Sequence, residues 1–257
     1  MGYELFNIYG PIGIHTYGLF IALGLMIFSW LVMQDKRFTT LKLTNKFSDI
    51  LFVGIIAALF GGRFLYILEE PSAFENYIEW FAFWKEGFSL LGSILGIIVI
   101  MPWYLKKLHI PVIPFADLIS IYAPLLQSIA RLGCFFAGCC YGLPTTLYWA
   151  TIYTDANTVA PLYCYLHPTQ LYSAGLLFLI FIFMYFIFQK IANKSGQLVT
   201  IYLMLASTER FIVDFWRADR TIMVNFSPLS FMQWVAFFIF IGAFSGFLYA
   251  SHQQEQY

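Results

Sequence analysis

Seven apolar stretches of about 20 residues constrain the fold of this chain more than any other feature. They are residues 13–33, 49–69, 88–106, 115–137, 169–189, 197–216 and 230–250. A helix of about 20 apolar residues spans the hydrocarbon core of a bilayer. Only 11% of the residues are charged, compared with about 25% in an ordinary soluble domain. We therefore predict an all-α polytopic membrane protein of about seven transmembrane helices, a single integral-membrane domain over 1–257 with an outer loop at about 141–166.

The charges between these stretches indicate the direction of each helix. Basic residues gather in the loops after the first, third and fifth stretches, at Lys36, Arg37, Lys42, Lys46, Lys106, Lys107, Lys190 and Lys194. The alternate loops are acidic or neutral and rich in Trp and Tyr. Because cytoplasmic loops carry an excess of Lys and Arg, the pattern predicts an outside N-terminus and a cytoplasmic C-terminus.

Arg131 is the clearest candidate for a functional residue. It lies in the apolar sequence SIARLGCFFAGCCYG, where a charge costs roughly 2.5–3.5 kcal/mol unless it faces protein or a wet cavity. The topology places it in the outer half of its helix. Other polar residues fall at the same level, namely Arg63, His167, Gln170, Tyr172, Glu209, Arg210, Asp214 and Arg217. The sequence thus predicts a polar cavity that opens toward the outer leaflet.

Several arginines in one cavity indicate an anionic ligand. Arg210, Asp214 and Arg217 have the spacing i, i+4, i+7, which puts them on one helical face where neighbours can pair. A guanidinium binds phosphate through two parallel hydrogen bonds and keeps its charge, so a phospholipid headgroup is the predicted ligand. The alternatives are structural salt bridges between helices and, for Arg217, a side chain that reaches the interface.

The four cysteines leave other functions open. Cys134, Cys139, Cys140 and Cys164 have no CxxC spacing, so they match neither the commonest redox motif nor a zinc knuckle. They either pack as small apolar side chains or pair as a disulfide in an oxidising compartment. A membrane thiol oxidoreductase is therefore an alternative function. A lipid-binding scaffold without turnover is a further alternative. The 14 basic and 14 acidic residues cancel, which gives no indication of nucleic-acid binding.

With these residues in view, the chain resembles the prolipoprotein diacylglyceryl transferase family along nearly its whole length. The similar segments are HTYGLFIALG, GGRFLYIL, GFSLLGSILGIIV, ARLGCFFAGCCYG, HPTQLYS, RFIVDFWRAD and LSFMQW. The resemblance implies catalytic roles for Arg131, Arg210 and His167. It implies substrate-binding roles for Tyr17, Arg63, Cys134, Gly142, Gln170, Tyr172, Asp214 and Arg217.

The family resemblance also implies an activity. The enzyme would transfer the diacylglyceryl group of phosphatidylglycerol to the lipobox cysteine of a prolipoprotein signal peptide and release glycerol phosphate. It would be a multi-pass protein of the bacterial plasma (inner) membrane, in contact with the membrane lipids. It would require neither a metal nor an organic cofactor. Arg131 and Arg210 would clamp the phosphate, and His167 or a carboxylate near Asp214 would act as base. A related transferase that modifies another acceptor is the alternative.

Four positions depart from the family pattern. Leu91 stands where the family has a histidine, and Cys134 stands where it has an asparagine. Cys139 replaces an acidic residue, and Ala206 replaces a tyrosine. These departures leave the general base and the acceptor open.

Overall fold

The structure is a computed structural model that describes residues 4–9, 12–71, 74, 76, 79–80, 87–156, 158–222 and 228–252. Its contacts divide the chain into two compact units. Unit 1 comprises Met1–Gln34 and Ala116–Tyr257, and unit 2 comprises Asp35–Phe115. Each unit is described by itself.

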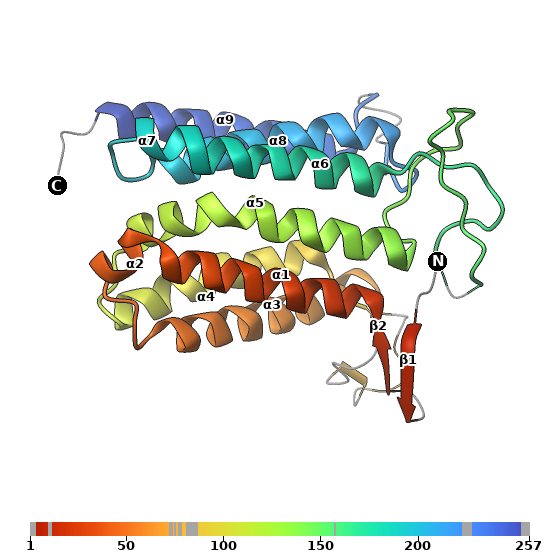
Figure 1. Ribbon diagram of the computed structural model, residues 1–257, viewed down its shortest axis with the longest axis horizontal. Helices are drawn as coiled ribbons and strands as arrows, with labels where there is room; N and C mark the ends of the chain where they lie inside the picture. Colours follow the sequence, from red (N-terminus) through yellow and green to blue (C-terminus); the bar gives the residue numbers. More distant parts are fainter. Residues whose placement is uncertain are drawn as a thin grey trace. The chain divides into compact units, whose positions relative to one another are not determined.

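Long apolar helices make up most of unit 1 (Figure 1). Its helices are α1 (Thr16–Gln34), most of α5 (Val112–Ala137), α6 (Thr169–Phe183), the π-helical turn η3 (Met184–Phe188), α7 (Gln189–Ile191), α8 (Gln197–Val213), the 3-10 turn η4 (Asp214–Trp216) and α9 (Phe231–His252). Before α1, the strands β1 (Glu4–Tyr9) and β2 (Ile12–His15) pair in antiparallel fashion. The all-α prediction did not include this short hairpin.

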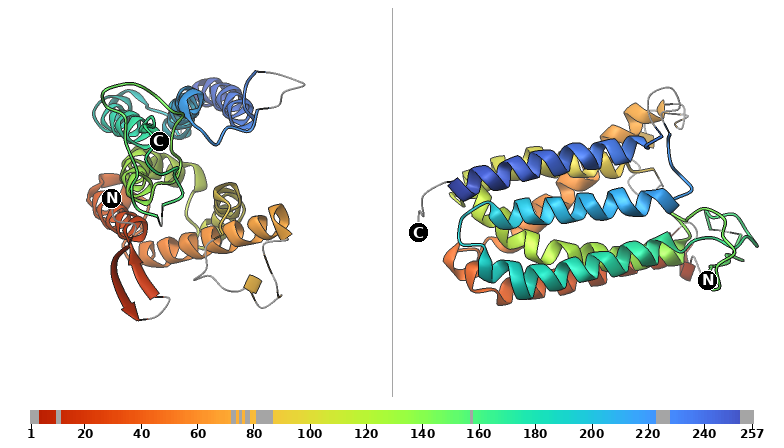
Figure 2. Two further views of the ribbon diagram at one scale, coloured as in Figure 1. Left: turned by 90° about the vertical axis from the view of Figure 1, so that its right-hand side faces the viewer. Right: turned by 90° about the horizontal axis from the view of Figure 1, so that it is seen from above.

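Glycines allow two of the unit 1 helices to approach closely. An added Cβ at Gly24 of α1 would lie 2.9 Å from Leu126 of α5, and one at Gly133 of α5 would lie 3.0 Å from Phe20 of α1. Small residues of this kind let helix backbones pack tightly in membranes. Elsewhere in the unit, α8 packs against both α6 and α9, and both views in Figure 2 show these helices side by side.

Hydrogen bonds hold together one end of the unit 1 bundle. The Asp117 carboxylate near the start of α5 accepts bonds from the backbone N–H groups of Gly196 and Val199, at 2.6 and 2.9 Å. These are donors that the first turn of α8 leaves without a partner within the helix. Lys194 Nζ also donates to the Ser251 carbonyl there, at 2.6 Å. Because Arg131 lies near the other end of α5, the candidate site of unit 1 belongs to the opposite end of this bundle.

Unit 2 is a tight helical pair with a short helix before it. It contains α2 (Lys36–Thr40), α3 (Phe47–Glu69), α4 (Leu90–Lys107) and the first residues of α5. An added Cβ at Gly61 would collide with the Gly92 carbonyl, and one at Gly96 would collide with the Ala57 carbonyl. Glycine is therefore required where α3 and α4 cross.

Six helices in the described residues are long and apolar enough to span a membrane. They are Thr16–Gln34, Phe47–Glu69, Leu90–Lys107, Val112–Ala137, Thr169–Ile191 and Phe231–His252. Each overlaps one of the predicted apolar stretches. The remaining stretch, 197–216, corresponds to α8, which has 17 residues and continues as the 3-10 turn η4. A multi-pass helical architecture is therefore supported, with six candidate spans.

Candidate active site

The predicted site residues of unit 1 meet at one end of α5, α6 and α8. The segment after α5 pairs with the segment after α8 through a β-bridge between Gly142 and Arg217. On either side of this bridge, Leu143 N donates to the Trp216 carbonyl at 2.8 Å, and Ala218 N donates to the Tyr141 carbonyl at 3.1 Å. Two segments about 75 residues apart in the sequence therefore share one short backbone ladder.

The start of α6 holds the same turn from the other side. Gly142 N donates to the His167 carbonyl at 3.0 Å, and Thr169 Oγ1 donates to the Cys140 carbonyl at 2.8 Å. Gln170, only 2% exposed, donates through Nε2 to the Cys139 carbonyl at 2.8 Å. An added Cβ at Gly142 would lie 2.5 Å from both Cβ and O of His167. Gly142 and Gln170 therefore fix the backbone that follows Arg131.

Arg131 has unused hydrogen-bonding capacity. It is half-buried, and its Nη1 lies 3.7 Å from Cys140 Sγ. Within the described part of the chain, Cys140 is the side-chain hydrogen-bond partner of Arg131. Glu209 is close enough to attract its charge, but this carboxylate is 8% exposed and already accepts a bond from Ser173 Oγ. A guanidinium carries five N–H donors, so most of those on Arg131 are available to a ligand.

The second arginine of the cluster is partly neutralised. Arg210 Nη2 lies 3.2 Å from Asp214 Oδ1, which confirms that the i, i+4 neighbours pair. Asp214 is 2% exposed and also accepts a bond from Ser230 Oγ. The oxygen that accepts from Ser230 is Oδ2, and Oδ2 also lies 3.7 Å from Arg220 Nε. The side chain of Arg210 keeps 27% of its surface exposed, so it can contact a ligand while Asp214 orients it.

Arg217 pairs with a different carboxylate. Its Nε and Nη2 donate to the two oxygens of Asp219, at 2.8 and 2.6 Å. Burial disfavours the charged guanidinium, but this bidentate bond and the nearby Cys140 outweigh burial and raise the pKa of Arg217. Arg131, Arg210 and Arg217 lie close enough to repel one another electrostatically. These three guanidinium groups therefore share one region of unit 1.

A chain of hydrogen bonds contains the third predicted catalytic residue. His167 Nδ1 lies 3.2 Å from the Tyr172 hydroxyl, and Trp149 Nε1 donates to the same hydroxyl at 2.6 Å. Because an indole N–H can only donate, the Tyr172 hydroxyl hydrogen is available for His167. The ring of His167 is thereby oriented by a residue of the outer loop and one of α6.

Three sulfurs form a second feature of this end of the bundle. The Sγ atoms of Cys134, Cys139 and Cys140 all lie within 4.8 Å of one another. All four cysteines of the chain are free, so the disulfide considered from the sequence is absent. Tyr17 of α1 interacts electrostatically with these three cysteines and with Arg131. The sequence assigns no catalytic or substrate-binding role to Cys139 or Cys140, although both lie in the segment that carries Arg131.

Arg63 belongs to unit 2 and has a different environment. Its guanidinium donates to the backbone carbonyls of Glu79 at 2.7 Å, Gly87 at 2.9 Å and Trp80 at 3.3 Å. Its Cζ also lies 4.9 Å from the centre of the Phe74 ring. The side chain is 2% exposed. Arg63 therefore holds the segment that joins α3 to α4.

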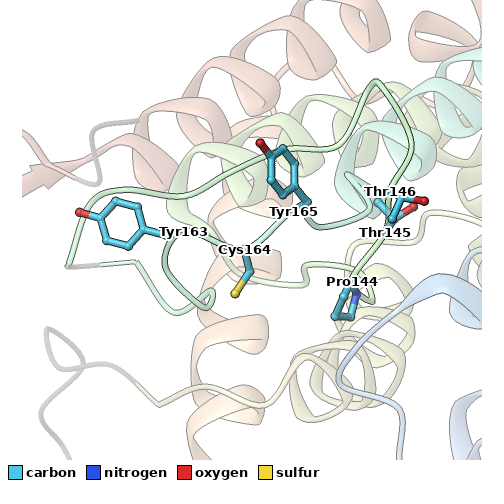
Figure 3. A pocket seen from close by; sticks show the side chains of 6 residues that line it. All are labelled: Pro144, Thr145, Thr146, Tyr163, Cys164 and Tyr165. Atoms are coloured by element: carbon cyan, nitrogen blue, oxygen red, sulfur yellow. The ribbon is translucent and has the colours of Figure 1, made fainter.

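The outer loop carries a surface hollow of about 590 Å³, shown in Figure 3. The residues that line it are Pro144, Thr145, Thr146, Tyr163, Cys164 and Tyr165. None of the predicted site residues is among them. Tyr153, which belongs to this loop, donates to the Phe135 carbonyl at 3.0 Å, and burial raises its pKa to about 12. The loop is thus anchored on the end of α5.

The six helices that are long and apolar enough to cross a membrane indicate a multi-pass membrane protein. Comparison with known proteins gives the family. The family model described as "Prolipoprotein diacylglyceryl transferase" matches residues 3–249. The chain therefore belongs to the prolipoprotein diacylglyceryl transferase family.

Curated relatives cover nearly all of the chain. The chain is 36% identical over 245 residues to the phosphatidylglycerol–prolipoprotein diacylglyceryl transferase of Clostridium tetani, covering 93% of this chain and 94% of the relative. It is 31% identical to the protein named transferase 2 of Clostridium perfringens, covering 89% and 88%. It is 29% identical to the Bordetella avium enzyme, covering 96% and 94%.

Proposed function

We propose that this protein transfers the diacylglyceryl group of phosphatidylglycerol to the lipobox cysteine of a prolipoprotein and releases glycerol phosphate. The observation that carries the proposal is the family match over residues 3–249. Relatives named for this reaction match more than nine-tenths of the chain at up to 36% identity. The convergence of Arg131, Arg210 and Arg217 supports a substrate that contains phosphate.

Arg131 and Arg210 bind the phosphate of the lipid in this proposal. Arg131 has donors to offer, and Arg210 is oriented by Asp214 while it stays partly exposed. Negative charge accumulates on the phosphate as its bond to the glyceryl carbon breaks. Fixed donors in a site with little water stabilise that charge without reorganising, and in many enzymes this electrostatic effect contributes most of the rate enhancement. Arg217 adds to the positive field, and Tyr17 lines the same region.

His167 is the proposed base for the acceptor thiol. The thiolate is the reactive form of a cysteine, so removal of the thiol proton speeds the transfer. The bond between His167 Nδ1 and the Tyr172 hydroxyl orients the imidazole. Gly142 and Gln170 hold the neighbouring backbone turn in place. Cys134 and Arg63 remain predicted contributors to substrate binding.

The proposed topology has seven spans, with α8 as the seventh. In this arrangement residues 1–257 act as one transferase domain in the bacterial plasma (inner) membrane. The N-terminus lies outside, the C-terminus lies in the cytoplasm, and the arginine cluster faces the outer leaflet. The distribution of lysines in the loops supports this orientation. Cysteine labelling from outside intact cells tests it, in a variant whose own four cysteines are replaced by serine. A single cysteine introduced at Tyr148, which is 94% exposed, should react, and one at Asn193 should not.

A purified-protein assay tests the reaction itself. Protein in detergent is mixed with phosphatidylglycerol labelled in its acyl chains and with a lipobox peptide, and a matched peptide with serine in place of cysteine is the control. Label on the cysteine peptide alone supports the proposal. Label on neither peptide but on another added nucleophile favours a related transferase. Bound lipid without any product favours a lipid-binding scaffold.

A further inference from the structure

The three sulfurs beside Arg131 are arranged as a set of metal ligands. Cys134 lies on the last turns of α5 and is 7% exposed, whereas Cys139 and Cys140 follow the helix. The three Sγ atoms lie within 4.8 Å of one another. Tetrahedral coordination at Zn–S distances of about 2.3 Å separates two sulfurs by about 3.8 Å. Small side-chain rotations therefore bring all three sulfurs onto one ion.

The backbone around the sulfurs is fixed independently of any ligand. Gly138 has φ of +71°, a left-handed conformation that ends α5 and turns the chain back on itself. Cys139 N then donates to the Cys134 carbonyl at 3.2 Å. The carbonyls of Cys139 and Cys140 each accept a bond from the start of α6, as described above. Hydrogen bonds that hold the ligating residues in place orient the ligands and strengthen metal binding.

The charges around the cluster suit a complex of three thiolates with a divalent ion. Three thiolates and Zn²⁺ carry a net charge of about −1. Arg131 lies 3.7 Å from Cys140 Sγ, and Arg217 also interacts with that sulfur. Their positive charges compensate the anionic complex. Magnesium and calcium prefer oxygen ligands, so three sulfurs select a zinc-like ion instead.

We propose that Cys134, Cys139 and Cys140 bind a zinc ion whose fourth position accepts the thiol of the incoming lipobox cysteine. This inference rests on the proposed function and departs from the expectation that no metal is needed. Three protein ligands with an open fourth position are typical of catalytic zinc sites, whereas structural sites are closed. An ion held beside Arg131 would bring the acceptor thiol next to the lipid phosphate.

The step balances without an oxidant or a reductant. The acceptor thiol gives its proton to His167, the proposed base, when it binds the ion, since metal coordination favours the thiolate. The sulfur then forms a bond to the glyceryl carbon, and the bond from that carbon to the phosphate oxygen breaks. The leaving glycerol phosphate takes the electron pair and finally the thiol proton.

Metal binding by the reduced, full-length protein in detergent is the first test. The protein is titrated with Co²⁺, which occupies sulfur sites of this kind and absorbs strongly when bound by thiolate, and the bound ion is counted after desalting. We expect one ion per chain. Each of Cys134→Ser, Cys139→Ser and Cys140→Ser should weaken binding by more than the roughly 10–100-fold that changes to the partners of metal ligands cost. Cys164→Ser, at the exposed fourth cysteine, should bind normally.

A wild-type spectrum provides a second test that does not depend on the folding of any variant. Adding the lipobox peptide should change the Co²⁺ absorption, and the serine peptide should not. The proposal is overturned if wild-type protein binds no more Co²⁺ than the Cys134→Ser variant, if two of the three cysteines are isolated as a disulfide, or if the cysteine peptide leaves the spectrum unchanged.

Transfer measured after chelation separates this inference from the transferase proposal. Loss of transfer on metal removal, with recovery on adding Zn²⁺, supports the zinc site. Transfer at full rate by metal-free protein ends the zinc proposal and leaves the transferase in place. One ion bound at the three cysteines, with a spectrum that responds to the peptide but no transfer under any condition, supports the site and contradicts the transferase.

Discussion

Two arginines in apolar helices of this protein show how differently the same side chain can be used. Arg63 in unit 2 directs its guanidinium at the carbonyls of Glu79, Trp80 and Gly87 and is 2% exposed. Arg131 in unit 1 is half-buried, and its side-chain hydrogen-bond partner among the described residues is a thiol at 3.7 Å. A weak sulfur acceptor leaves most of its donors available.

The difference between them predicts a mainly structural role for Arg63 and a ligand-binding role for Arg131. A guanidinium bonded to backbone carbonyls has its desolvation compensated within the protein, so it stabilises the fold and has little left for a ligand. A guanidinium that lies near two others is repelled by them. An anion that binds among them lowers this electrostatic energy. The number of satisfied donors therefore distinguishes the two roles better than depth in the apolar stretch does.

Arg131→Ala should have the largest effect on turnover. Loss of one fixed donor to a developing negative charge costs about 10²–10³ in kcat, and we expect a fall of that size with little change in thermal stability. Labelled phosphatidylglycerol and the lipobox peptide provide the measurement. Arg131→Lys keeps the charge without the planar fork and should retain an intermediate rate. Normal turnover in the alanine variant would remove Arg131 from the reaction.

Arg63→Ala should destabilise the fold more than it slows the chemistry. It leaves the carbonyls of Glu79 and Gly87 without this donor, and a buried group left unpaired costs about 1–3 kcal/mol. We expect a loss of about 3 kcal/mol in unfolding free energy, measured by thermal or denaturant unfolding in detergent. Arg63→Lys is the control. It should recover only part of the lost unfolding free energy, because one ammonium does not reach three carbonyls.

The opposite outcome for Arg63 is equally informative. An Arg63→Ala protein of native stability, with a raised KM for phosphatidylglycerol, would give Arg63 the substrate-binding role that the family resemblance implies. It would also mean that backbone hydrogen bonding does not mark an arginine as structural in this protein.

The sequence predicted the helices well because their signal is local. A run such as Phe47–Glu69 is long and apolar by itself, and neither its length nor its composition depends on the rest of the chain. α8 is less clear as a membrane span because Glu209 and Arg210 interrupt its apolar sequence and its α-helical part ends at Val213. The i, i+4 pairing of Arg210 with Asp214 was predictable for the same reason, since both residues lie on one helical stretch.

The features that the sequence did not predict depend on chain reversals and distant partners. The spacing of Cys134 from Cys139 matches no metal motif, yet the left-handed turn at Gly138 brings their sulfurs together. Gln170 is predicted to bind substrate, and the structure adds a contact that no local pattern indicates, from its Nε2 to the Cys139 carbonyl. The partners of Arg63 lie 16 to 24 residues away, in a segment whose path no local pattern encodes.

Gly142→Ala should show how far the site depends on the backbone turn after Arg131. The new Cβ would meet Cβ and O of His167 at 2.5 Å, so the bridge to α6 must shift. Overpacking of this kind costs about 1–3 kcal/mol, and we expect about 2 kcal/mol with a parallel fall in turnover. Gly175→Ala on α6, where nothing lies within 4 Å, is the matched control and should be neutral or slightly stabilising. Equal behaviour of the two variants would contradict a tightly fitted turn.

Tyr172→Phe should have the smallest effect, and it tests whether His167 works as an oriented base. The change removes the hydroxyl that contacts His167 Nδ1 and accepts from Trp149, but it keeps the ring. A hydrogen bond of about 1 kcal/mol corresponds to roughly a fivefold change in rate, so we expect kcat to fall about fivefold while KM for phosphatidylglycerol stays constant. The control is Tyr148→Phe, at a residue of the loop 141–166 that is 94% exposed. It should leave both kcat and KM unchanged. If Tyr172→Phe instead raises KM alone, the hydroxyl contacts the lipid and His167 needs no orientation from it.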